Sequence, residues 1–164
     1  MSIAVIFGGK SCEHNVSIVT GVQVLNEAAA LNPVPVYIDP DGEWRTGREL
    51  FAIEGCKNPK RLRKVYMRPS SDVLFGALGR KICRIDAAVL CCHGAHGEDG
   101  TLQGFLELCG VPYTGCDVLS SSLCMDKAAF KTFTADKGIP SVPYTCFTRA
   151  EFNRDIYSLS LIHI

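Results

Sequence analysis

The stretch that decides the fold is Ile3–Gly9, with the sequence IAVIFGG, and the apolar residues at helical spacing that follow it from Val16 to Leu31. Five consecutive apolar residues that end at two glycines predict a short strand buried on both faces. A strand that leads through a glycine-rich loop into a helix is the first half of a βαβ unit. We therefore expect an α/β protein with a Rossmann-like parallel sheet and flanking helices.

The same alternation continues along the chain. Val34–Ile38 predicts a second strand, Asp39–Gly42 a tight turn, and Asp86–Cys92 a further, central strand. The apolar stripe of Thr101–Cys109 predicts a helix that ends at Gly110. The remaining elements are expected as a hairpin strand at 43–45, a short strand at Val111–Tyr113, a helix from Asp117 to about Lys137, a strand at Val142–Phe147 and a helix that begins with a capping box at Thr148–Glu151.

Composition excludes several classes of protein. The 164 residues carry 17 Lys and Arg against 17 Asp and Glu, so the chain lacks the basic excess typical of nucleic-acid and membrane-surface binders. Residues 47–84 give no clear pattern, and we interpret their basic run, Lys57–Arg68, as a solvated loop. No apolar run approaches the roughly 20 residues that a bilayer crossing needs, and the N-terminus lacks the basic region of a signal peptide.

The nine cysteines indicate a compartment rather than a site. An odd number fits no closed disulfide framework, and the absence of a Cys-x-x-Cys pair argues against zinc. Most of them stand in apolar company, as Cys91 and Cys92 do, where a thiol packs as a small hydrophobe. We expect free thiols in a reducing, cytoplasmic location and no metal site.

Two loops follow predicted strands, where open α/β sheets bind their ligands: Gly8–His14 and His93–Gly100. Gly9, Lys10 and Ser11 resemble the end of a P-loop, but the leading glycine would fall at Ala4, inside the strand. The dinucleotide pattern Gly-x-Gly-x-x-Gly does not follow this strand either. The sequence therefore excludes both common phosphate-binding motifs.

The loops contain two candidate ligand-binding residues. Glu13 either complements the positive end of the following helix or holds a ligand ammonium group, and local chemistry favours neither. His93 stands at a strand tip inside a glycine-rich loop, which favours a ligand-binding role. The default role of Glu98 and Asp99, which precede a helix, is capping.

Four motifs in this order resemble the D-alanine–D-alanine ligase family. They are Phe7–Ser17, FGGKSCEHNVS; His93–Gly104, HGAHGEDGTLQG; Val111–Gly115, VPYTG; and Met125–Lys127, MDK. The resemblance extends over about residues 1–152 and is weakest from 47 to 84. It implies ATP-dependent joining of two D-alanines through an acyl phosphate, for peptidoglycan synthesis.

The resemblance also implies roles for individual residues. Glu13 would anchor the ammonium group of the first D-alanine, with Val16 and Ser17 nearby. His93 would lie beside the reacting carboxyl group, so that Glu13 and His93 are the catalytic residues, and Lys127 would reach the phosphates of ATP. Such preorganised charges orient the substrate and offset the charge that develops on a transferring phosphoryl group. The family uses ATP with Mg²⁺ or Mn²⁺, and most of the residues that bind them are expected beyond this chain.

The resemblance divides the chain into an N-terminal, pre-ATP-grasp domain at 1–125 and an incomplete start of an ATP-grasp domain at 126–164. A fragment of this kind is expected neither to hydrolyse ATP nor to make dipeptide by itself. Residues 158–164 break the helical pattern and resemble no part of the family, so we interpret them as a non-native tail.

Two alternatives remain open. A D-alanine–D-serine ligase of the vancomycin-resistance type fits residues 115–127 as well as a housekeeping ligase does. A non-catalytic α/β binding module would fold stably without a missing half, whereas a ligase fragment would expose an apolar face. The family commonly dimerises through its N-terminal region, so a homodimer is compatible with the sequence.

Overall fold

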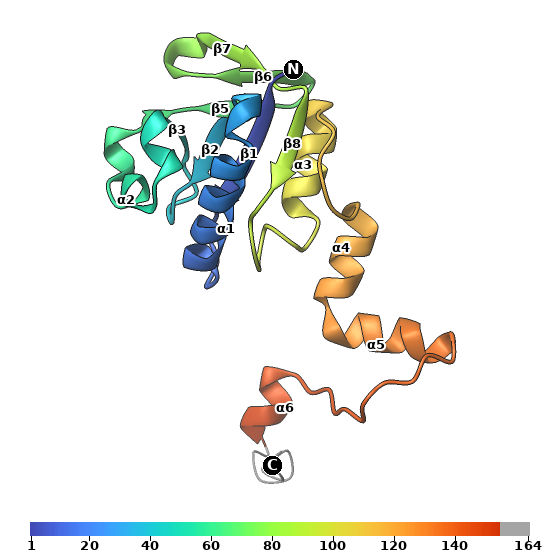
Figure 1. Cartoon of the computed structure of the whole chain (residues 1–164). Helices are drawn as coiled ribbons and strands as arrows, with labels where there is room; N and C mark the ends of the chain where they lie inside the picture. Colours follow the sequence, from blue (N-terminus) through green and yellow to red (C-terminus); the bar gives the residue numbers. More distant parts are fainter. Residues whose placement is uncertain (155–164) are drawn as a thin grey trace. The chain divides into compact units, whose positions relative to one another are not determined.

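The computed structural model describes residues 1–154, which fall into two compact units, Met1–Met125 and Asp126 onward. The first unit contains two sheets and the helices that pack on them (Figure 1). No helix among the described residues is long and apolar enough to span a membrane. The strands and helices of the first unit are β1 Ile3–Gly8, α1 His14–Glu27, β2 Val34–Ile38, β3 Trp44–Thr46, α2 Ile53–Cys56, β4 Arg63–Lys64, β5 Tyr66–Arg68, β6 Ser71–Phe75, β7 Lys81–Arg84, β8 Ala87–Leu90, α3 Thr101–Cys109 and α4 Val118–Met125.

The larger sheet has five strands in the order β4-β3-β2-β1-β8. The first strand, β1, pairs in parallel with β2 on one side and with β8 on the other. The β2–β3 and β3–β4 pairs are antiparallel, so the sheet is mixed. The predicted parallel arrangement is therefore confirmed for β1, β2 and β8 but not for the edge. The expected hairpin after β2 is present as β3.

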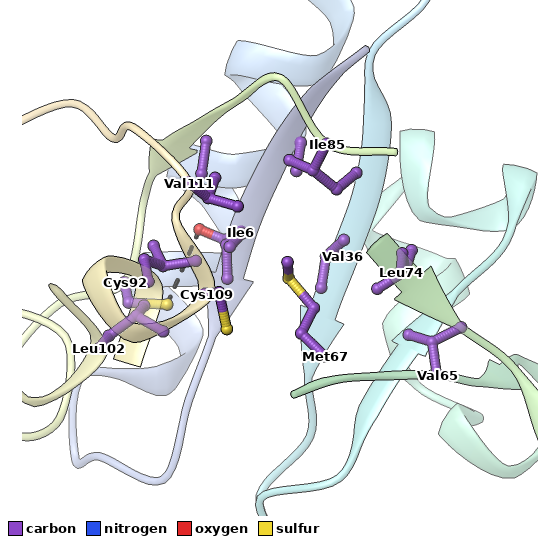
Figure 2. Close-up of a cluster of buried hydrophobic side chains, with 13 residues drawn as sticks. Ile6, Val36, Val65, Met67, Leu74, Ile85, Cys92, Leu102, Cys109 and Val111 are labelled. Carbon is purple, nitrogen blue, oxygen red and sulfur yellow. Dashed lines mark hydrogen bonds between the residues drawn. The ribbon is translucent and has the colours of Figure 1, made fainter. Parts of the chain in front are cut away.

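Strand β1 is buried on both faces, as its sequence predicts. Ala4 and Ile6 contribute to a core with α3, β2 and the smaller sheet, and Figure 2 shows Ile6 in this core near the Cys92 thiol. Val5 and Phe7 point to the opposite core, which α1 covers. Because two side-chain sets are buried, this strand fixes the positions of both helices and of the loop that follows it.

Helix α1 approaches β1 closely because residue 21 is glycine. A Cβ atom at Gly21 would clash with the ring of Phe7. Alanine favours a helix over glycine by about 1 kcal/mol, yet we expect Gly21→Ala to destabilise the protein by about 1–3 kcal/mol because the clash forces the helix away from the sheet. Gly104→Ala in α3 is the matched control, since its Cβ would meet only Val118 at an ordinary 3.6 Å. Urea unfolding should show opposite signs for the two variants, and equal signs would contradict this packing.

The β2–β3 turn is held by a buried carboxylate. Asp39 is 2% exposed and accepts hydrogen bonds from the amides of Asp41 and Glu43 and, at 2.7 Å, from Nε of Arg45. Burial by itself raises the pKa of Asp39, but these hydrogen bonds and the Arg45 charge outweigh burial and hold the pKa below its usual value.

A lowered carboxyl pKa stabilises the folded state above the unfolded-state pKa, and this contribution is lost as the pH falls through the folded-state pKa. Asp39→Asn should therefore destabilise the chain at neutral pH, and its difference from wild type should shrink in acid. The measurement is the free energy of unfolding in urea from neutral to acidic pH. Asp41→Asn, which removes an exposed charge from the same turn, is the control. A wild-type-to-variant difference that does not change with pH would contradict the assignment.

Residues 47–84 contain more structure than their sequence indicates. β5, β6 and β7 form a separate antiparallel sheet, and the basic run that we interpreted as a loop contains all of β4 and β5. That interpretation is wrong because Leu62, Val65 and Met67 alternate with the basic residues and are buried. The strands are short, and their charged side chains face solvent, which hides the pattern.

The predictions beyond Gly110 are partly wrong. The single helix expected from Asp117 to Lys137 is two helices, α4 and α5 (Lys127–Asp136), since Asp126 accepts hydrogen bonds from the amides of residues 128 and 129 and so begins a new helix. Val111–Tyr113 forms one parallel bridge, Ala88 with Tyr113. No strand forms at Val142–Phe147 among the described residues, where no neighbouring strand is available to pair with it. The capping box at Thr148 and Glu151 is confirmed at the start of α6 (Arg149–Arg154).

The thiols behave as the sequence predicts. All nine cysteines are free, and Cys56, Cys91, Cys92 and Cys109 are buried. Burial raises the pKa of Cys91 to about 11 and, with the nearby Cys91, that of Cys92 to about 12. These thiols therefore stay protonated and pack as hydrophobic side chains.

Candidate functional site

The two glycine-rich loops lie side by side because they follow neighbouring parallel strands. The first loop leaves β1 at Gly8, and the second leaves β8 after Leu90. The amide of Cys91 donates to the carbonyl of Ile6 at 2.8 Å, which extends the pairing to the end of both strands. The carboxyl ends of β1 and β8 thus bring Glu13 and His93 to the same edge of the sheet, as the sequence predicts for open α/β folds.

Ser17 fastens the two strand ends together from inside the core. Its hydroxyl accepts a hydrogen bond from the Gly8 amide at 2.7 Å and donates one to the Cys91 carbonyl at 2.6 Å. Ser17 is completely buried. The expectation that Ser17 lies among the ligand-contacting residues does not fit this geometry, because its hydroxyl is already engaged with the backbone of both strands. Its role is to support the two loops.

Removing this hydroxyl should cost stability. Ser17→Ala leaves the amide of Gly8 and the carbonyl of Cys91 without a partner, and each buried unpaired group costs about 1–3 kcal/mol. We expect a destabilisation of about 2–4 kcal/mol in chemical unfolding. Ser122→Ala, at an exposed position of α4, serves as the control and should change stability by about 0.5 kcal/mol or less. Equal effects of the two substitutions would refute the role of Ser17.

Gly94 lets the second loop pass close to the first. A Cβ atom at this residue would lie 2.6 Å from Oγ of Ser11 and 3.4 Å from the carboxyl carbon of Glu13. Its φ angle of 70° is in the left-handed region, which favours glycine. Oγ of Ser11 in turn accepts a hydrogen bond from the Glu13 amide at 3.0 Å. The Glu13 carboxylate is exposed to solvent. The first loop holds its backbone through Ser11, and the second loop passes close to its carboxyl group at Gly94.

His93 has polar partners on both edges of its ring. Its Nε2 lies 3.0 Å from Oγ1 of Thr20 on α1, and its Nδ1 lies 3.6 Å from Oε1 of Glu98. The other carboxylate oxygen of Glu98 accepts a hydrogen bond from the Gly94 amide at 2.6 Å. One side-chain atom each of Glu13, His93 and Glu98 lies within 4.8 Å of the others. Two carboxylates around one small space attract positive charge, so this cluster is a candidate site for a cation such as an ammonium group.

Two of these residues were missed or misassigned from the sequence. Glu98 was expected to cap the next helix, but it binds the loop backbone and faces His93; Asp99 is the residue that accepts hydrogen bonds from the amides of His96 and Thr101. Thr20 was not singled out, although it stands four residues after Val16 and hence on the same face of α1. Only the pairing of β1 with β8 shows that this face meets His93.

The other two predicted residues, Val16 and Lys127, are both exposed. Val16, in the first turn of α1, is 56% exposed. Lys127 belongs to the second unit, where it is the exposed first residue of α5.

On the α3 side of the larger sheet, an apolar cleft of about 680 Å³ is lined by Trp44, Met67 and Phe105 among others. Gly9, Lys10, His96 and Gly97 of the two glycine-rich loops also line this cleft, whereas Glu13, His93 and Glu98 do not.

The fold and the cluster define an α/β domain with a small-ligand site at the carboxyl ends of its parallel strands. The chain belongs to the D-alanine–D-alanine ligase family: the family model for the D-ala D-ala ligase N-terminus matches residues 2–116. This confirms the resemblance found in the four sequence motifs.

Relatives of known name agree with this assignment. The D-alanine–D-alanine ligase of Thermosipho melanesiensis is 37% identical over 164 residues, which is 96% of this chain and 45% of the relative. The D-alanine–D-alanine ligase structure from Coxiella burnetii has a TM-score of 0.80 at 30% identity and covers 96% of this chain and 50% of its own. The VanG D-Ala:D-Ser ligase of Enterococcus faecalis has a TM-score of 0.77 at 33% identity, with 96% and 48% coverage. The chain thus spans about half the length of the relatives it matches.

Proposed function

We propose that this chain is the N-terminal part of an ATP-dependent D-alanine–D-alanine ligase and holds the site for the first D-alanine. The observation that carries the proposal is the gathering of Glu13, His93 and Glu98 at the ends of β1 and β8. Their chemistry suits an amino acid, since the carboxylates attract its ammonium group.

Within this site Glu13 anchors the ammonium group of the first D-alanine, and His93 lies beside the carboxyl group that reacts. Val16, three residues after Glu13, offers an exposed apolar surface for the small methyl side chain. Ser17 acts from the core, where it holds the two strand ends in register. Held in this way, the substrate loses its freedom of orientation before the reaction, which lowers the barrier to bond formation.

ATP supplies the phosphoryl group that activates the carboxyl group in this reaction. Lys127 fits a role in holding its phosphates, because its cationic side chain is exposed at the first residue of α5. We assign no described residue to the divalent cation, Mg²⁺ or Mn²⁺, that accompanies ATP.

Several observations support the interpretation of the chain as a fragment in which an ATP-grasp domain only begins at Asp126. Among residues 126–154 only Thr134 is buried. Large apolar side chains are exposed instead, which is the face expected of an unfinished domain and not of a free-standing binding module. They are Phe130, Phe133, Ile139, Val142, Tyr144 and Phe152. The hypothesis of a non-native tail at 158–164 concerns residues outside the described part of the chain.

The second substrate distinguishes the principal proposal from its alternative. The similarity to VanG, a D-Ala:D-Ser ligase, favours D-serine as a second candidate for that substrate.

We also propose a cytoplasmic location, which nine free cysteines support, and a homodimer as the assembly to test.

The experiment is an assay of the purified full-length protein with ATP, Mg²⁺ and D-alanine, with D-serine or D-lactate added as a competing second substrate. We expect D-alanyl-D-alanine as the main product, whereas a predominance of D-alanyl-D-serine would establish the alternative. The 164-residue chain should form no dipeptide under the same conditions. Dipeptide formation by this chain would contradict the fragment interpretation, and an inactive full-length protein would contradict the ligase function.

A further inference from the structure

The contacts of Thr20 constrain which nitrogen of His93 carries the proton. Oγ1 of Thr20 lies 3.1 Å from the carbonyl oxygen of Val16 and 3.0 Å from Nε2 of His93. A hydroxyl has one hydrogen, and a carbonyl oxygen only accepts. If Thr20 donates to Val16, it has only lone pairs to offer His93, so that Nε2 must be the donor. Nε2 then carries the ring hydrogen, and Nδ1 is left facing Glu98.

Glu98 holds His93 on the opposite edge of the ring. One carboxylate oxygen of Glu98 accepts the hydrogen of the Gly94 amide at 2.6 Å, which fixes the backbone immediately after His93. The other oxygen lies 3.6 Å from Nδ1 of the ring. A charge-assisted hydrogen bond to a backbone amide is stronger than a neutral one, so this contact resists loop motion. The helix hydroxyl therefore contacts the ring of His93 directly, and Glu98 acts through the backbone that follows it.

We propose that Thr20 and Glu98 are positioning residues for His93. Thr20 sets the Nε2–H tautomer and the ring orientation, and Glu98 fixes the loop backbone immediately after the ring, beside the space shared with Glu13. The proposal rests on the proposed function, because the orientation of His93 matters only if this ring meets the substrate. The same ring geometry would make His93 present one defined edge to the first D-alanine.

The test of Thr20 is ¹⁵N NMR of the imidazole rings in the 164-residue chain, with His93 assigned among the four histidines by its loss in His93→Gln. We expect the wild type to show the Nε2–H tautomer. Thr20→Ser, which keeps the hydroxyl, should keep this tautomer, whereas Thr20→Val, which has the same shape without the hydroxyl, should give a mixture. An Nδ1–H ring in the wild type, or an unchanged ring in Thr20→Val, would overturn the proposal.

The test of Glu98 is hydrogen exchange at the Gly94 amide in the same chain. Glu98→Ala should raise the exchange rate by about tenfold or more, because a charge-assisted hydrogen bond is lost, and Glu98→Gln should recover part of the protection. Asp99→Asn is the control for a neighbouring charge and should leave Gly94 unchanged. Equal rates in wild type and Glu98→Ala would overturn the role of Glu98.

These measurements use no substrate, so they can fail independently of the proposed function. If the wild type fails to bind D-alanine although the ring and amide signals behave as expected, the substrate assignment is wrong and the positioning network stands. Circular dichroism of each variant identifies one that does not fold, and the conservative Thr20→Ser and Glu98→Gln variants then decide the outcome.

Discussion

Replacing Glu13 by glutamine in the full-length protein is expected to lower kcat/KM for the first D-alanine about 100-fold, which corresponds to about 2.7 kcal/mol. Glutamine keeps the size and one acceptor oxygen of Glu13 but loses the charge that attracts the ammonium group. The effect should appear mainly as a higher KM, since the charge acts on the bound substrate and on the transition state alike.

The control for this substitution is Glu27→Gln at the other end of α1, which removes an exposed carboxylate from the same helix. It should leave the kinetics unchanged. The KM for ATP should also stay near the wild-type value in Glu13→Gln. A loss of activity that affects ATP and D-alanine equally would indicate a damaged fold instead of a lost substrate contact.

The second large effect is expected for Gly94→Ala. The new Cβ would lie 2.6 Å from Oγ of Ser11 and within 3.5 Å of the Glu13 carboxylate, in a backbone conformation with a φ angle of 70° that alanine disfavours. The Ser11 hydroxyl must move away, which breaks its hydrogen bond to the Glu13 amide and shifts Glu13 relative to His93. We expect activity of the full-length protein to fall by about 100-fold or more, because small misplacements of a positioning group have effects of this size.

Gly110→Ala separates the steric effect from backbone strain. Gly110 ends α3 with a φ angle of 72°, nearly the same as that of Gly94, but a Cβ there would meet nothing within 4 Å. It should therefore cost about 1–2 kcal/mol of stability from the left-handed backbone and leave the activity of the folded protein intact. If both variants lost activity to the same extent, the clash with Ser11 and Glu13 would not be the cause.

The sequence predicted the parts of the fold that follow from local patterns. The buried run at Ile3–Phe7, the glycine after Cys109 and the capping box at Thr148 each have a single local explanation, and each prediction was confirmed. The small sheet of β5–β7 was not predicted, because its strands are short and their partners lie in the same unreadable region. The expected strand at Val142–Phe147 failed for a related reason, since a strand forms only beside a partner.

The main residues of the site could be predicted from the sequence, but the residues that hold them in place could not. The strand-end position of Glu13 and His93 follows from the βα pattern, whereas the residues that hold them depend on which strands pair. Ser17 illustrates the limit: its motif suggests a ligand contact, and its burial against Gly8 and Cys91 shows a structural role. Thr20 lies outside the four motifs and Glu98 lies within the second, but neither position shows from the sequence that the residue contacts His93.

The central claim is that the Glu13 cluster binds the ammonium group of D-alanine, and calorimetric titration of the full-length protein tests it most directly. Wild-type protein should bind D-alanine, Glu13→Gln should bind it about 100-fold more weakly, and N-acetyl-D-alanine, which lacks the ammonium charge, should bind weakly to both. Equal affinity of the two proteins for D-alanine, or tight binding of N-acetyl-D-alanine to the wild type, would contradict the account.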